Sequence, residues 1–205
     1  MIYDISPLID EAIAVWPGDS DPESRDILRI SDGASVNLST ITLSCHTGAH
    51  ADAPNHYVDD APGIDEVPIE RYIGDCVLVD VSPRDNAVRP EDLDGVELNG
   101  AARVLLRTGC YRDRTTFPDP LTCLTPELVQ FFALRRIVLT GLDSPSVDRF
   151  DSKELPSHKA MYEHGIAILE NLQLEGVPAG RYELIALPLR LKGRDASPVR
   201  AILRT

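Results

Sequence analysis

The chain has 205 residues, and its 33 Asp and Glu against 20 Lys and Arg give a formal net charge of −13. This length is enough to bury a substantial core in one unit, so we expect residues 1–205 to form a single domain. So acidic a protein is poorly suited to the phosphate backbone of nucleic acids or to an anionic membrane surface, and we expect neither as a partner.

The apolar runs are too short to cross a bilayer. The longest, Val77–Val81 and Ile185–Leu189, fall far below the ~20 residues of a spanning helix. The first six residues, MIYDIS, lack the basic start, apolar stretch and cleavage site of a secretory signal. No Cys-x-x-Cys pair of the kind found in zinc ribbons and redox motifs occurs among the four cysteines, Cys45, Cys76, Cys110 and Cys123. We therefore expect a cytoplasmic protein with reduced thiols.

Seven segments with alternating or continuous apolar residues predict strands. In chain order they are Val36–Leu43, Val77–Val81, Val104–Arg107, Ile137–Thr140, Ile166–Leu169, Leu184–Leu189 and Val199–Leu203. Turn-forming and acidic residues predict surface loops at Trp16–Ser24, Asp59–Pro68 and Ser82–Asp94. The pattern therefore indicates a chain dominated by β-structure.

Two helices are predicted. Thr125 followed by Pro126 provides a cap and a first-turn proline ahead of an apolar run. A second helix is predicted over Ser157–Glu163, with Gly165 just beyond its end. Strands and helices do not alternate strictly, which disfavours a doubly wound nucleotide-binding fold. We expect an irregular α/β domain with a mixed β-sheet core and few helices.

The histidines are ordinary in number but uneven in place. Of the five, His46, His50 and His56 lie within eleven residues, together with Asp52. In an extended chain His50 and Asp52 project to the same side, and Gly48 permits the bend that brings His46 to join them. Imidazoles and a carboxylate that converge in this way are suited to Zn²⁺, Mn²⁺ or Fe²⁺. The alternative is a polar surface loop without a shared function.

Two downstream residues are candidates for further ligands. His158 falls in the first turn of the second predicted helix, and Glu170 follows the strand Ile166–Leu169, where a charge usually has a partner. Taken alone, each reads more simply as an ordinary solvent-exposed residue. His164 precedes Gly165 at the helix end, and we assign it a structural role there.

The run from His46 to Tyr57, HTGAHADAPNHY, resembles the signature of the cyclase-like metal-dependent hydrolases, and within them the bacterial kynurenine formamidases, or arylformamidases. The histidine-rich run marks the superfamily, whereas stretches along nearly the whole chain favour the formamidases. These stretches are Tyr3–Pro7, Val15–Asp19, Val104–Thr108, Gly141–Ser146, Gly165–Glu170 and Pro178–Arg200.

The resemblance implies a cyclase-like fold of the swivelling β/β/α type. It also implies hydrolysis of N-formyl-L-kynurenine to L-kynurenine and formate, a step of tryptophan degradation, in a homodimer or higher homo-oligomer. Two zinc ions per subunit are implied, with manganese or iron as alternatives. The residues that the resemblance places at the metals are His46, His50, Asp52, His158 and Glu170. It assigns His56 the role of catalytic general acid and base.

Four other residues bear on this site. Cys45 and Asn55 depart from the family's pattern, so Cys45 could coordinate or oxidise, and Asn55 could alter the pocket wall. Asp143 or a backbone carbonyl is expected to fix the tautomers of the histidines. Trp16, the only tryptophan, is either a core residue or a substrate-binding residue that stacks on an aniline ring.

Hydrolysis of an aryl formamide needs an activated water and a proton for the departing nitrogen. Two metals would lower the pKa of a bridging water from ~15.7 toward ~7 and polarise the formyl oxygen. His56, free of the metals and with an ordinary pKa of ~6.5, would carry the proton. The rival interpretations are an isatin hydrolase of the same superfamily and a non-catalytic metal-binding protein, in which a free His56 would have no role.

Overall fold

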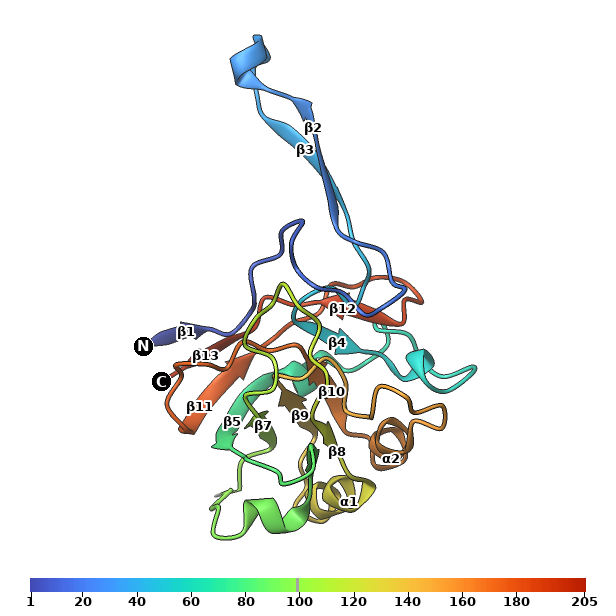
Figure 1. The fold of residues 1–205 in the computed structure, drawn as a ribbon, viewed down its shortest axis with the longest axis vertical. Coiled ribbons are helices and arrows are strands. Elements are labelled where there is room, and N and C mark those ends of the chain that lie inside the picture. Colours follow the sequence, from blue (N-terminus) through green and yellow to red (C-terminus); the bar gives the residue numbers. More distant parts are fainter. Residues whose placement is uncertain (99) are drawn as a thin grey trace.

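The computed structural model describes residues 1–98 and 100–205. One nine-stranded sheet forms the body of the molecule (Figure 1). Its strands are β1 (Ile2–Asp4), β4 (His50–Asp52), β5 (Ile73–Asp80), β7 (Arg103–Arg107), β9 (Leu139–Leu142), β10 (Ala167–Glu170), β11 (Gly180–Ile185), β12 (Ala196–Pro198) and β13 (Ile202–Arg204). They lie in the order β1-β13-β11-β5-β7-β9-β10-β4-β12. The central strands β5, β7, β9 and β10 pair in parallel, and the outer pairs are antiparallel.

Both faces of the sheet are covered. On β7, Leu105 faces one apolar cluster, whereas Val104 and Leu106 face the other, because alternate side chains of a strand point to opposite faces. The helices α1 (Pro126–Leu134) and α2 (Pro156–His164) pack on the second cluster through Phe132 and Met161. Strands buried on both faces read as continuous apolar runs, which explains why the central strands were recognisable in the sequence.

Both predicted helices are confirmed. The Thr125 side chain accepts a hydrogen bond from the backbone N–H of Leu128 at 3.3 Å and so caps α1. α2 is followed by Gly165, whose φ of +63° lies in the left-handed region. Within the described ranges these are the only α-helices, beside the short 3₁₀ turns η1 (Ile30–Asp32), η2 (Pro54–His56), η3 (Ile69–Tyr72) and η4 (Pro90–Leu93). No helix in this part of the chain is long and apolar enough to span a membrane.

The predicted strands at the centre of the sheet are confirmed as β5, β7, β9 and β10, with ends that differ by a few residues. The predicted strand Leu184–Leu189 is β11, which begins and ends earlier. The predicted strand Val199–Leu203 is wrong in its bounds. β12 pairs with β4 and ends at Pro198. β13 begins at Ile202 and pairs with β11 and β1, so the predicted strand is interrupted between them.

The predicted strand Val36–Leu43 exists as β3 (Leu38–Thr42), but it lies outside the body. It pairs with β2 (Glu23–Leu28) in an antiparallel hairpin that projects away from the sheet (Figure 1). Every residue of both strands is exposed. The predicted loop Trp16–Ser24 therefore ends in a strand that the sequence did not indicate, because β2 is mostly polar.

The two other predicted loops have different outcomes. Residues 59–68 contain turns and bends but no helix or strand, as predicted. The stretch Ser82–Asp94 includes η4 and a short strand, β6 (Ala87–Val88), which pairs in parallel with β8 (Cys123–Leu124). The overall result is nevertheless the expected one, a mixed sheet with few helices.

Candidate metal centre

The histidine-rich run enters the sheet as β4, between β10 and β12. The register places His50 opposite both Glu170 and Pro198. His50 and Asp52 share one face of the strand, while Ala51 between them is buried in the opposite core cluster. The pairing of β10 with β4 thus places Glu170 beside His50 and Asp52, the two predicted ligands on β4.

The predicted bend before β4 is present. Gly48 has a φ of +67°, a left-handed conformation that glycine adopts without a steric penalty. The bend returns His46 to the site, where its Nδ1 lies 3.2 Å from Asp52 Oδ1. His46, His50 and Asp52 therefore converge as the spacing predicted.

His50 faces the two carboxylates through Nε2. This atom lies 3.3 Å from Asp52 Oδ1 and 3.4 Å from Glu170 Oε2. On the other side of the ring, Nδ1 lies 2.9 Å from the carbonyl oxygen of Gly48, which can only accept a hydrogen bond. Nδ1 therefore carries a proton, and Nε2 is the nitrogen that faces the carboxylates.

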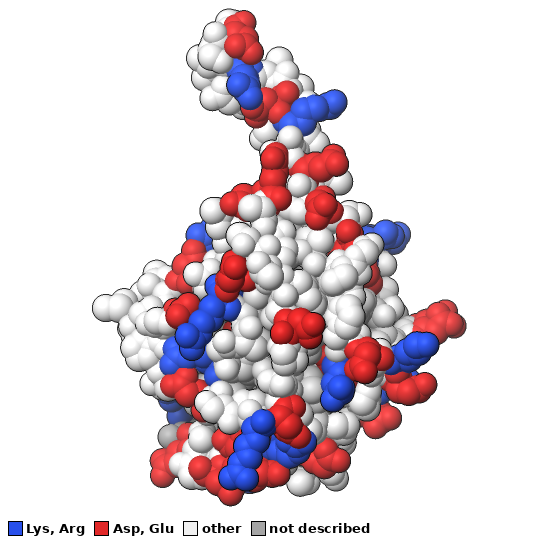
Figure 2. All heavy atoms as spheres, viewed as in Figure 1, with Lys and Arg blue, Asp and Glu red and all other residues white. Residues whose placement is uncertain are grey.

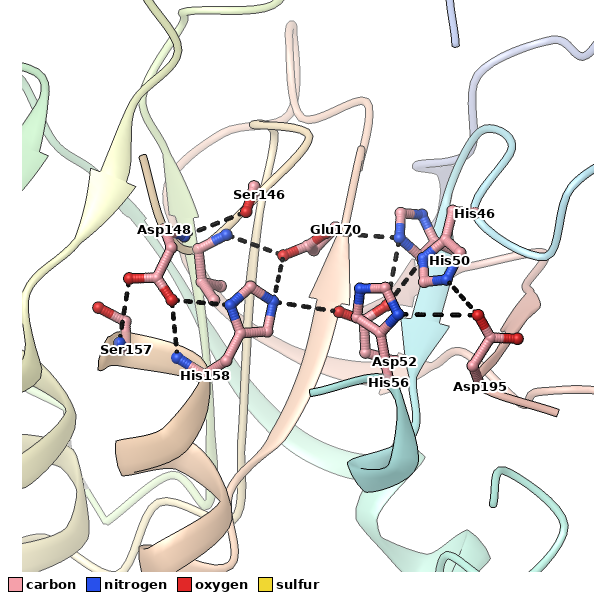
Figure 3. A network of polar contacts seen from close by, with 11 residues as sticks. His46, His50, Asp52, His56, Ser146, Asp148, Ser157, His158, Glu170 and Asp195 are labelled. Atoms are coloured by element: carbon pink, nitrogen blue, oxygen red, sulfur yellow. Dashed lines mark hydrogen bonds and ion pairs between the residues drawn. The ribbon is translucent and has the colours of Figure 1, made fainter. Parts of the chain in front are cut away.

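His158 approaches from the first turn of α2. Its Nε2 lies 3.5 Å from Asp52 Oδ2 and 3.7 Å from Glu170 Oε1 (Figure 3). Its Nδ1 lies 2.8 Å from Asp148 Oδ2, and the Asp148 carboxylate also accepts hydrogen bonds from the backbone N–H groups of Ser157 and His158. Asp148 therefore fixes both the ring and the start of the helix.

The cluster fits a divalent metal. Asp52 is 3% exposed, and neither of its carboxylate oxygens has a hydrogen-bond partner among the described residues; the same holds for Nε2 of His50. Buried polar atoms normally have partners, so these orphaned atoms point to a ligand between them. Imidazole nitrogens and carboxylate oxygens are donors that zinc, manganese and iron accept.

Ligand-type atoms gather in two overlapping groups. His50, Asp52 and Glu170 form one group, and His46, Asp52 and His56 form the other. In each group the atoms lie within 4.8 Å of one another. Asp52 belongs to both groups, because its two oxygens face different histidines. The second group also places His56 close enough to serve as a ligand.

Electrostatics differ sharply across the cluster. Burial alone would lower the pKa of His50, but the carboxylates of Asp52 and Glu170 raise it to about 10. Burial would likewise lower the pKa of His158, but the carboxylates of Asp148 and Asp52 outweigh this effect and raise it to about 10. Burial would raise the pKa of Asp52, yet the close approach of His158, His46 and His50 holds it well below its usual range. Without metal, the site is a network of imidazolium and carboxylate groups.

His56 occupies a different environment at the end of η2. Its side chain is 35% exposed, and its Nδ1 lies 3.7 Å from Asp195 Oδ2. Burial lowers its pKa, and the nearby Asp52 only partly opposes this. At neutral pH His56 is therefore an uncharged imidazole that can accept a proton.

The cluster opens into a cavity of about 470 Å³. Its lining includes the polar residues His46, His50, His56, His158 and Glu170 and the aromatic residues Trp16, Phe117 and Tyr111. Trp16 meets Phe117 edge-on, with ring centroids 5.3 Å apart, and stacks on Phe150 at 5.0 Å. Trp16 is therefore not a core residue, since it forms part of a half-buried aromatic wall. A second cavity of about 560 Å³ shares Tyr111 but contains none of the histidines.

Sequence reasoning missed three residues of the site. Asp148 and Asp195 face histidines, and Asn171 lines the cavity with a left-handed backbone, at φ +58°, and a buried amide oxygen that lacks a partner among the described residues. Asn171 directly follows Glu170, so its position could have been noticed. Asp148 and Asp195 lie in loops remote from the motif, and no spacing signals them.

The expectation for Asp143 is wrong. Its carboxylate accepts hydrogen bonds from the backbone N–H groups of Thr108 and Gly109 and from the Thr108 hydroxyl, so it orders a loop rather than a histidine. The alternative expectation, a backbone carbonyl, is met by Gly48. Burial raises the pKa of the Cys45 thiol, and Cys45 belongs to neither group of ligand-type atoms among the described residues. The Asn55 amide donates to the Gly193 carbonyl at 3.4 Å.

Comparison with known proteins identifies the family. The family model described as "Putative cyclase" matches residues 3–149. The chain belongs to this cyclase family. A kynurenine formamidase from Polaromonas naphthalenivorans is 45% identical over 203 residues, which cover 99% of this chain and 90% of the relative.

Solved structures of the cyclase family share the fold. A "predicted metal-dependent hydrolase" from Bacillus stearothermophilus is 27% identical, with a TM-score of 0.83 over 99% of this chain and 97% of that one. Isatin hydrolase A from Labrenzia aggregata, bound to benzyl benzoate, is also 27% identical, with a TM-score of 0.84 over 99% and 93% of the two chains. These likenesses confirm the predicted family and fold.

Proposed function

We propose that this member of the cyclase family is a metal-dependent hydrolase that converts N-formyl-L-kynurenine and water to L-kynurenine and formate. One observation carries the proposal: the histidines and Glu170 of the cluster, among them His50 with its unpartnered Nε2, line the same cavity as Trp16, Phe117 and Tyr111. The relative that is 45% identical over nearly the whole chain is a kynurenine formamidase, which supports the same substrate.

The cavity suits a small aromatic amide. A volume of about 470 Å³ lies within the range of small-molecule sites. Trp16 and Phe117 offer ring faces and edges on which an aniline ring can stack. A formamide attached to that ring would then share the cavity with the histidines that line it.

The residues that would hold the metal are His46, His50, Asp52, His158 and Glu170, and we propose two zinc ions per subunit. When bound, a divalent metal acts as a Lewis acid that lowers the pKa of water and polarises a carbonyl oxygen. Asp52 suits the bridging position because its two oxygens face different histidines. Glu170 is held in place by the backbone N–H of Val147, which donates to its Oε1 at 2.8 Å.

His56 is the general acid and base of the proposal. The uncharged imidazole takes a proton from the attacking water as a bond forms between the water oxygen and the formyl carbon. It then delivers the proton to the aniline nitrogen as the carbon–nitrogen bond breaks, so that kynurenine leaves as a neutral amine. The formyl carbon departs as formic acid, which ionises in water to formate and a proton.

A second candidate is the opening of isatin, a cyclic amide. The likeness to isatin hydrolase A, at 27% identity and a TM-score of 0.84, favours it as the alternative. The deciding experiment measures kcat/KM of the metal-loaded protein for N-formyl-L-kynurenine and for isatin. A higher value for the formamide supports the proposal, and activity confined to isatin overturns it.

We further propose that two copies associate through the β2–β3 hairpin. An isolated two-stranded hairpin is marginally stable in water. This one exposes several large apolar side chains, namely Ile27, Leu28, Ile30, Val36, Leu38 and Ile41. Burial against a second copy would remove them from water. We also propose a cytoplasmic location, where the four free cysteines stay reduced.

A further inference from the structure

One carboxylate oxygen at the rim of the cavity faces two histidines. Asp195 Oδ2 lies 3.1 Å from His46 Nε2 and 3.7 Å from His56 Nδ1 (Figure 3). The two rings lie side by side, with centroids 4.3 Å apart. Asp195 is thus placed between a proposed metal ligand and the proposed general acid and base.

The backbone fixes Asp195 beside this pair. Asp195 directly precedes β12, whose first residue, Ala196, is the register partner of Asp52. The Asp195 carbonyl oxygen accepts a hydrogen bond from the N–H of Ala53 at 2.8 Å. The carboxylate is therefore carried on the same ladder that carries the metal-binding face of β4.

The loop before Asp195 is tied to the turn that carries His56. Gly193 donates its N–H to Asp65 Oδ1 at 2.7 Å, and its carbonyl accepts from the Asn55 amide at 3.4 Å. Because Asn55 is the neighbour of His56 in η2, the two segments are held together. Asp195 and His56 are therefore carried on segments that are joined in the absence of substrate.

The orientation of the two rings follows from hydrogen-bond chemistry. An ionised carboxylate accepts hydrogen bonds and donates none, so each nitrogen that faces Asp195 carries a proton when the bond forms. For His46 the other nitrogen, Nδ1, lies 3.2 Å from Asp52 Oδ1 and is the atom left for a metal. For His56 the same proton placement leaves Nε2 bare, ready to accept a proton. The longer contact to His56 is the kind that shortens when substrate binds.

We propose that Asp195 is a positioning residue that sets the tautomer and orientation of both His46 and His56. The catalytic part of this role rests on the proposed function, and it names the group that holds the proton carrier in place. Carboxylates that orient histidines at metal sites contribute about 10–100-fold to activity or metal affinity.

The test compares Asp195→Asn with Asp65→Asn as the matched control. The amide at position 195 offers no charged oxygen to the two histidine N–H groups. Asp65→Asn makes the same change on the adjoining 59–68 loop, outside the cavity lining, and keeps an acceptor for Gly193. At saturating zinc we expect Asp195→Asn to lower kcat by about 10–100-fold with KM within about twofold. Asp65→Asn should match the wild type. An unchanged kcat, or a loss confined to KM, overturns the proposal.

Two further measurements do not depend on turnover. Nitrogen-15 NMR of the ring nitrogens should show the His56 proton on Nδ1 in the wild type and its transfer, wholly or partly, to Nε2 in Asp195→Asn. Zinc affinity of this variant should fall by about 10–100-fold. A tautomer and an affinity that both stay at wild-type values overturn the role of Asp195. If the wild type hydrolyses no N-formyl-L-kynurenine, the proposed function fails, and these two measurements still decide the role of Asp195.

Discussion

His50 and His158 reach the same pair of carboxylates, but different groups hold the far side of each ring. The Gly48 carbonyl accepts from His50 Nδ1, and the Asp148 carboxylate accepts from His158 Nδ1. In both residues this leaves Nε2 facing Asp52 and Glu170. The rings are thus oriented before any metal arrives, which is the arrangement that ligand histidines usually have.

The raised pKa values predict proton release when metal binds. At pH 7 the metal-free His50 and His158, each with a pKa of about 10, are protonated. A metal needs the neutral rings, so we expect roughly two protons released per chain from this pair and a metal affinity that weakens as pH falls.

Zinc titration calorimetry at pH 7, in buffers of different ionisation enthalpy, measures this number. Histidines with an ordinary pKa of ~6.5 would already be mostly neutral and would release far less than one proton each. A total well below one proton would contradict the expected charge state of the cluster.

Removal of His56 and removal of His50 should have different effects. His56→Ala should keep the metal content and lower kcat by about 10²–10⁴-fold, because the proton carrier is lost. His50→Ala should lose metal and activity together. Elemental analysis measures the metal content of each variant, and steady-state kinetics measures its kcat. Loss of metal from His56→Ala would instead make His56 a ligand, as its place beside His46 and Asp52 permits.

Individual site residues could be predicted from the sequence where residues close together in the chain are also close together in space. The spacing of His46, His50 and Asp52 around a glycine was enough to predict that they converge. Asp148 and Asp195 reach the same histidines from distant loops, and a carboxylate in an acidic chain carries no mark of its partner. Only the fold brings them to the site.

Among the elements, β4 is the one that assembles the centre. It is three residues long, yet its pairing with β10 delivers Glu170 and its pairing with β12 delivers Asp195. Neither β4 nor β12 was predicted as a strand, because each is too short to show a hydrophobic period. The central strands and both helices were predictable from burial on both faces and from cap residues.

The hydrogen bond of Thr125 is predicted to stabilise the start of α1. Thr125→Ala removes the side-chain acceptor for the Leu128 N–H, and we expect the free energy of unfolding to fall by about 1 kcal/mol. Urea denaturation of metal-matched samples measures it. A change near zero would mean that the hydrogen bond of Thr125 does not hold the helix end.

The projecting hairpin leads to a prediction about assembly. Leu38→Ser combined with Ile41→Ser should weaken the proposed dimer by at least tenfold, because each buried apolar side chain contributes about 1.5–3 kcal/mol. Leu134→Ser, at an equally apolar position that is 77% exposed at the end of α1, is the control. Light scattering over a dilution series reports the dissociation. A wild type that is monomeric at all concentrations, or a hairpin variant that dissociates no more readily than the control, contradicts the hairpin's role.

For the molecule as a whole, the acidic charge excludes partners rather than selecting a substrate. Figure 2 shows acidic and basic side chains interspersed over the visible face and along the hairpin, with uncharged surface between them. The net charge of −13 therefore does not mark the site. Bound dications would reverse the local field at the buried carboxylates, where the reaction takes place.

The central claim is that metal on the histidine cluster drives formamide hydrolysis. Its most direct test is formate release from N-formyl-L-kynurenine by chelator-treated protein to which zinc is returned in measured amounts. We predict negligible release without metal and a rise that reaches its plateau at two zinc ions per chain. Full release from metal-free protein, or none at any zinc content, would contradict the claim.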